Sequence, residues 1–111
     1  MSRPLQIGNL LANLPCARDG EQTEQLASCN SVRIERIVSA GQITPEGTWY
    51  DQAWDEWVAV LQGSATLVFD GDAEDLSLTV GDWILLPAGC RHRVSATSSD
   101  PVCLWLAVHT Q

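Results

Sequence analysis

Two stretches of the sequence hold side chains that could do chemistry. The first runs from Gly41 to Glu56 and carries the carboxylates Asp51 and Glu56, and the second runs from Gly81 to the imidazole of His92. Carboxylates and imidazoles together can hold a divalent metal and suit Mn, Fe, Zn or Ni. Without a metal, carboxylates kept away from water should have raised pKa values, which suits acid–base chemistry.

Further side chains could line a ligand pocket beside these groups. Trp49, Tyr50 and Gln52 lie in the first stretch, and aromatic faces commonly wall a small-molecule site. His109 offers a second imidazole near the end of the chain. It would join the site only if it faces inward, which the sequence leaves open.

Arg36 is a further pocket candidate with two readings. It alternates with Ile34 and Val38, so it points inward if those apolar residues do. There it could hold an anionic ligand or neutralise Glu56. If Ile37 marks the inner face instead, Arg36 is solvated.

The elements that must position these side chains are short strands. Turn chemistry recurs between apolar segments, as at Asn30-Ser31 and Gly81-Asp82, with glycine supplying positive φ. Strands at intervals of about 8–12 residues predict a β-sandwich or barrel. The predicted strands are Glu24–Cys29, Val32–Ser39, Trp54–Leu61, Ala65–Asp70, Asp75–Val80, Trp83–Leu86, His92–Thr97 and Val102–His109.

The last predicted strand is apolar at every position from Val102 to Val108. A strand with one wet face should alternate instead, so we expect both of its faces to be covered. One face would fill the barrel, and the other would meet a second sheet or another subunit. In so short a chain, this favours a homodimer.

The second stretch resembles a motif of the cupin superfamily, whose members are small jelly-roll barrels. The motif consists of Gly, five residues, Pro, one residue, Gly, two residues, His, three residues and Asn. Gly81, Pro87, Gly89 and His92 match it, and Ala96 replaces its final Asn. The resemblance implies an all-β fold, a single cupin-type jelly-roll β-barrel with a short N-terminal arm. We expect one domain, with the arm and first strand in residues 1–31 and the barrel in residues 32–111.

The first cupin motif is degenerate in this chain. Glu56 stands seven residues before Gly63, as in the family pattern, but the two histidines that usually precede this glutamate are absent. The longer spacing of the family places Trp49 and Asp51 at their positions, and the shorter spacing places Tyr50 and Gln52 there.

A reduced metal set follows from this resemblance. Asp51 is the only common ligand among the replacements, so the resemblance implies a divalent metal held by Asp51, Glu56 and His92. His109 would be a fourth ligand if it faces inward.

The resemblance implies a small-molecule enzyme of the isomerase, dioxygenase or decarboxylase type. In such an enzyme a metal would polarise a carbonyl or enediol, with Glu56 or Asp51 as base and Tyr50 as acid. The alternative is a metal-free barrel that binds or senses a small ligand without catalysis. The fold alone does not choose between them.

Composition narrows the partners further. The 111 residues include 14 acidic and six basic ones, for a formal net charge of −8, which argues against nucleic-acid or anionic-membrane partners. No segment resembles a signal peptide or a membrane span, and the four cysteines form no CxxC pair. We therefore expect a cytoplasmic protein with reduced cysteines and a small-molecule ligand.

Overall fold

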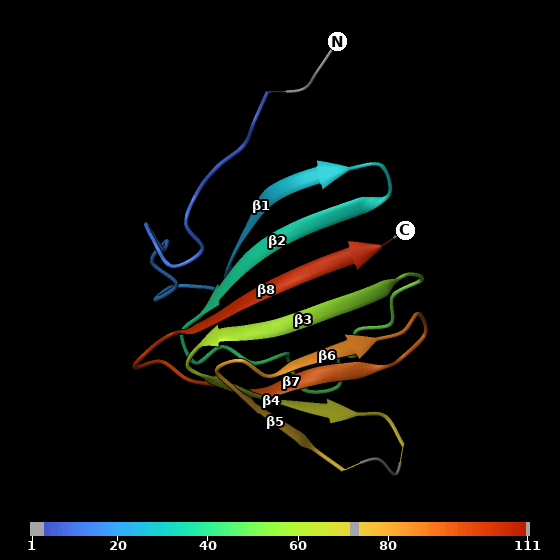
Figure 1. The fold of residues 1–111 in the computed structure, drawn as a ribbon. Coiled ribbons are helices and arrows are strands. Elements are labelled where there is room, and N and C mark those ends of the chain that lie inside the picture. Colours follow the sequence, from blue (N-terminus) through green and yellow to red (C-terminus); the bar gives the residue numbers. More distant parts are fainter. Residues whose placement is uncertain (1–3, 72–73, 111) are drawn as a thin grey trace.

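The computed structural model describes residues 4–71 and 74–110, and within them eight strands and no helix are present (Figure 1). The strands lie within two residues of the predicted ranges at every end. They are β1 (Gln22–Cys29), β2 (Val32–Ser39), β3 (Asp55–Gln62), β4 (Ser64–Phe69), β5 (Leu76–Thr79), β6 (Trp83–Leu86), β7 (His92–Thr97) and β8 (Cys103–Thr110). None of the described segments forms a helix with the length and apolarity needed to cross a bilayer.

The strands form two antiparallel sheets that face each other (Figure 1). The larger sheet has the order β1-β2-β8-β3-β6, and the smaller has the order β5-β4-β7. Consecutive strands often lie in different sheets, as β3 and β4 do, so the chain winds around a common interior. This arrangement confirms the predicted all-β jelly roll.

The core lies between the two sheets. Alternate residues of β3 and β8 point into it, so Val58 and Val60 meet Trp105 and Ala107 there, as the period of two along a strand requires. Leu67 closes the core from the smaller sheet.

The outer face of the larger sheet is covered in part by the chain's own N-terminal arm. Leu104 of β8 is fully buried with Val38 of β2 and Ala17 of the arm, and Leu14 packs against them. Both faces of β8 are therefore covered at Leu104, as its unbroken apolar sequence predicts. The cover at this position comes from the same chain rather than from a second subunit.

Gly63, in the turn between β3 and β4, is a position where we expect a side chain to be destabilising. Its φ is +76°, and a Cβ there would lie 2.7 Å from the carbonyl oxygen of Val102 and clash with Ser98 Oγ. Gly63→Ala should therefore lower the free energy of unfolding by about 2–3 kcal/mol, measured by urea denaturation.

Gly81 gives the matched control, because its φ is +92° but a Cβ there would meet open space. Gly81→Ala should lower the free energy of unfolding by only about 1 kcal/mol through backbone strain. Equal losses in the two variants would contradict the role assigned to the close approach at Gly63.

Candidate functional site

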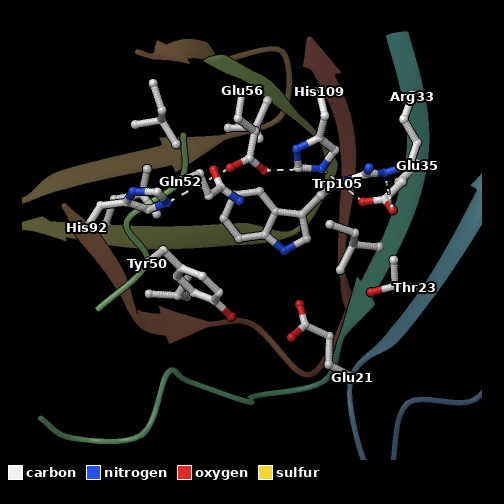
Figure 2. A pocket seen from close by; sticks show the side chains of 15 residues that line it. Glu21, Thr23, Arg33, Glu35, Tyr50, Gln52, Glu56, His92, Trp105 and His109 are labelled. Carbon is white, nitrogen blue, oxygen red and sulfur yellow. Dashed lines mark hydrogen bonds and ion pairs between the residues drawn. The ribbon is translucent and has the colours of Figure 1, made fainter. Parts of the chain in front are cut away.

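A cavity of about 270 Å³ lies between the two sheets, at the end where β3 and β7 begin and β8 ends (Figure 2). Inward-facing side chains of these strands, of β2 and of the loop before β3 form its wall. Drug-sized ligands occupy sites of about 300–1,000 Å³. This cavity is therefore slightly smaller than the usual site of a drug-sized ligand.

Glu56, the second residue of β3, is the central acidic group of the cavity. Its carboxylate lies between two imidazoles, with Oε1 4.0 Å from His92 Nε2 and Oε2 3.9 Å from His109 Nε2 (Figure 2). Burial raises the pKa of this carboxyl, and Glu35 raises it further, while the two histidines and a hydrogen bond from Gln52 act in the opposite direction. The balance is a carboxyl that keeps its proton to higher pH than an exposed glutamate does.

His92 begins β7, and its ring is oriented by the backbone. Its Nδ1 lies 2.9 Å from the carbonyl oxygen of Cys90, and a carbonyl only accepts, so Nδ1 carries the hydrogen. The neutral ring then presents the lone pair of Nε2 to the cavity, with Glu56 facing it. The Tyr50 ring stacks on the imidazole, with 5.5 Å between ring centroids, and holds its plane.

His109 of β8 faces the cavity as well, and both of its nitrogens are engaged. The indole of Trp54 only donates, so its 2.9 Å hydrogen bond to Nδ1 leaves that nitrogen as an acceptor. Nε2 therefore carries the hydrogen of the neutral ring and donates it to Glu35 at 2.9 Å. Arg33 closes a ring of contacts by bonding Glu35 at 3.1 Å and lying over Trp54.

The loop before β3 separates its predicted site residues onto two sides. Tyr50 pairs with His92 through two backbone hydrogen bonds, so the segment is extended and neighbouring residues point to opposite sides. Tyr50 and Gln52 line the cavity. Trp49 and Asp51 do not line it, and they contact Arg91 instead.

Arg36 differs from the expectation that it lines the pocket. Ile37, not Arg36, faces the cavity from β2. Arg36 is nevertheless buried, because its guanidinium bonds Glu24 and backbone carbonyls of residues 9–13 on the outer face of the sheet. The prediction that Ile37 faces inward and Arg36 outward is therefore right. The prediction that Arg36 is solvated is wrong, because the N-terminal arm covers the outer face of the sheet at this position.

Comparison with known proteins agrees with this geometry. The model of the Cupin_2 family, described as "Cupin domain", matches residues 37–109. The chain belongs to the cupin family. No curated protein matches this cupin.

Solved structures of other proteins share the fold. A protein from Ralstonia eutropha JMP134, named as a "putative mannose-6-phosphate isomerase", is 42% identical, with a TM-score of 0.90 over 96% of this cupin and 99% of that chain. An RmlC-like cupin from Desulfovibrio desulfuricans has 21% identity and a TM-score of 0.77, over 96% and 97% of the two chains. A cupin superfamily protein from Desulfitobacterium hafniense DCB-2 has 21% identity and a TM-score of 0.76, over 96% and 93%. The last two likenesses concern the fold alone.

Several cavity residues of this cupin were missed at the level of sequence. They are Arg33 and Glu35 of β2, Trp105 of β8, and Glu21 just before β1. Trp54, just before β3, was also missed; it does not line the cavity but hydrogen-bonds His109. Arg33 and Glu35 share the parity of Ile37, so choosing Ile37 as the inner residue would have found them. The sequence carries no comparable signal for Glu21, which reaches the cavity only through the pairing of β1 with β2.

The metal set predicted for this cupin does not match the donor geometry. Neighbouring nitrogen and oxygen ligands about 2.0–2.2 Å from one ion lie about 3.0–3.5 Å apart. Here His92 and His109 lie 4.0 and 3.9 Å from different oxygens of Glu56, and Nε2 of His109 carries a hydrogen. Asp51 lies outside the cavity. In the part of the chain that the structure describes, no group of three or more His, Cys, Asp or Glu could hold a metal ion. The described residues therefore do not fit the predicted metal.

The raised pKa of Glu56 predicts a pH dependence of stability. The folded state holds this proton more tightly than the unfolded chain, so Glu56 stabilises the fold below its ordinary pKa of 4.5. That contribution is lost as pH rises through the raised pKa. Glu56→Gln should therefore show a smaller fall in the free energy of unfolding than the wild type between about pH 4 and about pH 8, measured by urea denaturation.

Glu74→Gln is the control for this measurement, because Glu74 is exposed and does not line the cavity. Its pH profile should run parallel to that of the wild type. A Glu56→Gln profile that is also parallel would contradict the raised pKa.

Proposed function

We propose that this cupin is an isomerase that moves a proton between neighbouring carbon atoms of a small hydroxy-carbonyl compound such as an aldose. One observation carries the proposal. Nε2 of His92, with its lone pair free, lies 4.0 Å from a carboxyl oxygen of Glu56 whose pKa is raised. A base and an acid therefore face the same small space.

The reaction balances with these two groups. His92 accepts the proton from the hydroxyl-bearing carbon, while protonated Glu56 donates its proton to the neighbouring carbonyl oxygen, which gives an enediol. His92 then returns its proton to the former carbonyl carbon. Glu56 takes the proton of the other hydroxyl, so the product is a ketose and both side chains regain their starting forms.

The surrounding residues support these roles. The raised pKa of Tyr50, caused first by burial and then by Glu21, keeps its hydroxyl protonated, so Tyr50 can donate a hydrogen bond to the ligand. Gln52 holds the Glu56 carboxyl by a side-chain hydrogen bond. Glu35 and His109 position the other side of Glu56.

Two arguments favour isomerisation over the other activities implied by the family. An acid and a base suffice for it, whereas a dioxygenase also needs oxygen and a group that activates it. The 42% identical protein from Ralstonia eutropha bears the name of a sugar isomerase. The alternative is a barrel that binds a small ligand without catalysis.

Deuterium exchange tests the proposal. Purified protein is incubated in D₂O with D-mannose, D-xylose or D-ribose, and proton NMR follows C2 deuteration and ketose formation. We expect exchange above the buffer rate with at least one of these sugars, and an unchanged rate after treatment with a chelator. Binding without exchange would overturn the isomerase and support the binding barrel, and neither binding nor exchange would overturn both.

We also propose that the chain forms a homodimer through the outer face of the larger sheet. On edge strand β6, Trp83 and Leu85 are 62% and 51% exposed. Trp83 stacks on Trp57 of β3 with 6.0 Å between ring centroids, and Val108 of β8 is the strand partner of Trp57. These residues extend an apolar strip across three strands, which is typical of an interaction surface.

Light scattering at micromolar concentration should give the mass of a dimer for the wild type. It should give the mass of a monomer for Trp83→Arg with Leu85→Arg. Val80→Arg is the control, since Val80 is 64% exposed but lies in the turn before β6 rather than in the strip, and it should remain dimeric. A monomeric wild type would overturn this proposal.

A further inference from the structure

The ionisable side chains around the cavity are mostly carboxyl groups. Glu21, Glu35 and Glu56 line it, and Arg33 is the one arginine among the described residues that does so. His92 lines it too, with a side chain only 6% exposed and an Nε2 that has no hydrogen-bond partner among the described residues. The cavity is therefore built to receive a polar molecule, and its charge decides which one.

The positive charge of Arg33 is paired with a carboxylate in the cavity wall. Its Nε bonds Glu35 Oε2 at 3.1 Å, and its guanidinium lies 5.9 Å from the centre of the Trp54 ring. Glu35 is itself held in place by His109. The positive charge is thus neutralised within the wall, and Glu35 is the residue that neutralises it.

Glu21 brings negative charge to the other end of the cavity. Figure 2 shows its carboxylate pointing into the space on the opposite side of Trp105 from Glu56, near the hydroxyl of Tyr50. Its hydrogen-bond donor among the described residues is the uncharged hydroxyl of Ser39, at 3.1 Å. No arginine or histidine of residues 4–71 and 74–110 lies within 4.0 Å of its oxygens.

The other arginines with described contacts are engaged elsewhere. Arg36 holds the N-terminal arm on the outer face of the sheet. Arg91 pairs with Asp70 and Asp51 outside the cavity. Arg93 donates to the backbone carbonyl of Thr44. A phosphate or carboxylate entering the cavity would meet Glu35 at one end and Glu21 at the other, and the one arginine among the described lining residues is already paired with Glu35.

We propose that the cavity takes an uncharged polyhydroxyl ligand and excludes phosphorylated and carboxylated ones, with Glu21 and Glu35 setting this selectivity. The inference names the substrate class of the proposed isomerase and rests on that function only for the choice of a sugar. It sets this chain apart from the substrate in the name of its relative from Ralstonia eutropha, a sugar phosphate.

Binding, rather than turnover, tests this inference, so an inactive protein can still be measured. His92 and His109 are the only two histidines of the chain, and both line the cavity, so their imidazole NMR signals report on it without interference. The probes are D-mannose, mannose 6-phosphate and inorganic phosphate, titrated at constant pH. In the wild type we expect D-mannose to bind at least about tenfold more tightly than mannose 6-phosphate, and inorganic phosphate to give no saturable shift.

The double variant Glu21→Gln with Glu35→Gln should gain anion binding, because it removes two carboxylates from the cavity wall and leaves Arg33 without its carboxylate partner. We expect its affinity for both phosphate probes to rise at least about tenfold. Glu46→Gln with Glu74→Gln removes the same charge from exposed positions outside the cavity, and it should bind like the wild type. Native histidine signals in each free variant establish that it is folded.

The outcomes separate the two proposals. If the wild type prefers mannose 6-phosphate, or if the double variant gains no affinity for inorganic phosphate, the charge inference is overturned. If neither sugar binds but the double variant gains phosphate binding, the exclusion of anions by Glu21 and Glu35 stands, and the polyhydroxyl ligand is overturned.

Discussion

Replacing Glu56 with glutamine should lower the rate of sugar isomerisation by about 10²–10⁴-fold, the range expected when a general acid is removed. Glutamine keeps the shape of the side chain and can still hydrogen-bond Gln52, but it has no acidic proton to donate to the carbonyl oxygen. The loss should fall on kcat, because proton donation matters in the transition state more than in ligand binding. The measurement is the initial rate of ketose formation from the best aldose of the panel.

Asp51→Asn is the matched control for Glu56→Gln. Both changes replace a carboxylate with its amide, but Asp51 has a side chain 55% exposed and faces Arg91 rather than the cavity. Its rate should stay within about twofold of the wild type, since surface ion pairs contribute little. A comparable loss in Asp51→Asn, or a Glu56→Gln variant that keeps its rate, would contradict the assignment of the acid.

The pH profile distinguishes a lost acid from a damaged fold. Burial raises the pKa of Glu56 because it disfavours the charged carboxylate, so the uncharged amide variant should be at least as stable as the wild type at neutral pH. A variant that is inactive but stable indicates a chemical role. Its rate should also lack the fall that the wild type shows as pH rises through the raised pKa of Glu56.

The fold was predictable because the sequence marks its turns. Gly63, Gly71 and Gly81 each adopt positive φ in the structure, and each lies between segments of strong β-formers. Strand boundaries follow from such positions within two residues. The position of His92 at the start of β7 follows from the same local spacing, since it needs only the turn before it.

The rest of the cavity depends on pairings distant in sequence. The two possible spacings of the first cupin motif predict different residue pairs in the cavity. The backbone pairing of Tyr50 with His92 turns Tyr50 and Gln52 toward the cavity, as the shorter spacing predicts. Both faces of β2 carry apolar residues, because the arm covers the outer one, so alternation could not show which face is inside. The contacts that orient His109 join residues up to 74 positions apart, and no local pattern encodes them.

Arg36→Ala should produce the largest loss of stability among the substitutions considered. The side chain is 7% exposed and its Nη2 lies 2.7 Å from a carboxylate oxygen of Glu24. Its Nη1 donates to the carbonyl of Ala12 at 2.7 Å and to that of Leu10 at 3.1 Å. Alanine would leave these acceptors of the arm without a donor, and water cannot reach all of them while the arm stays in place.

We expect the free energy of unfolding to fall by about 3–5 kcal/mol in Arg36→Ala, the usual range for breaking a buried ion pair. The lower part of the range is more appropriate, because the Glu24 side chain is 39% exposed and its charge is partly screened. Urea denaturation gives the loss. Hydrogen exchange should show that amides of residues 9–17 lose protection first, since the guanidinium holds this segment on the sheet.

Two controls locate the effect in the geometry of the guanidinium. Arg91→Ala removes the same side chain from a surface pair in which it is 46% exposed, so its loss should be less than about 1 kcal/mol. Arg36→Lys keeps the charge but offers a compact ammonium in place of a planar fork, so it should recover only part of the stability. If Arg36→Ala costs no more than Arg91→Ala, the arm is held by Leu14 and Ala17 alone, and the charge of Arg36 is incidental to the fold.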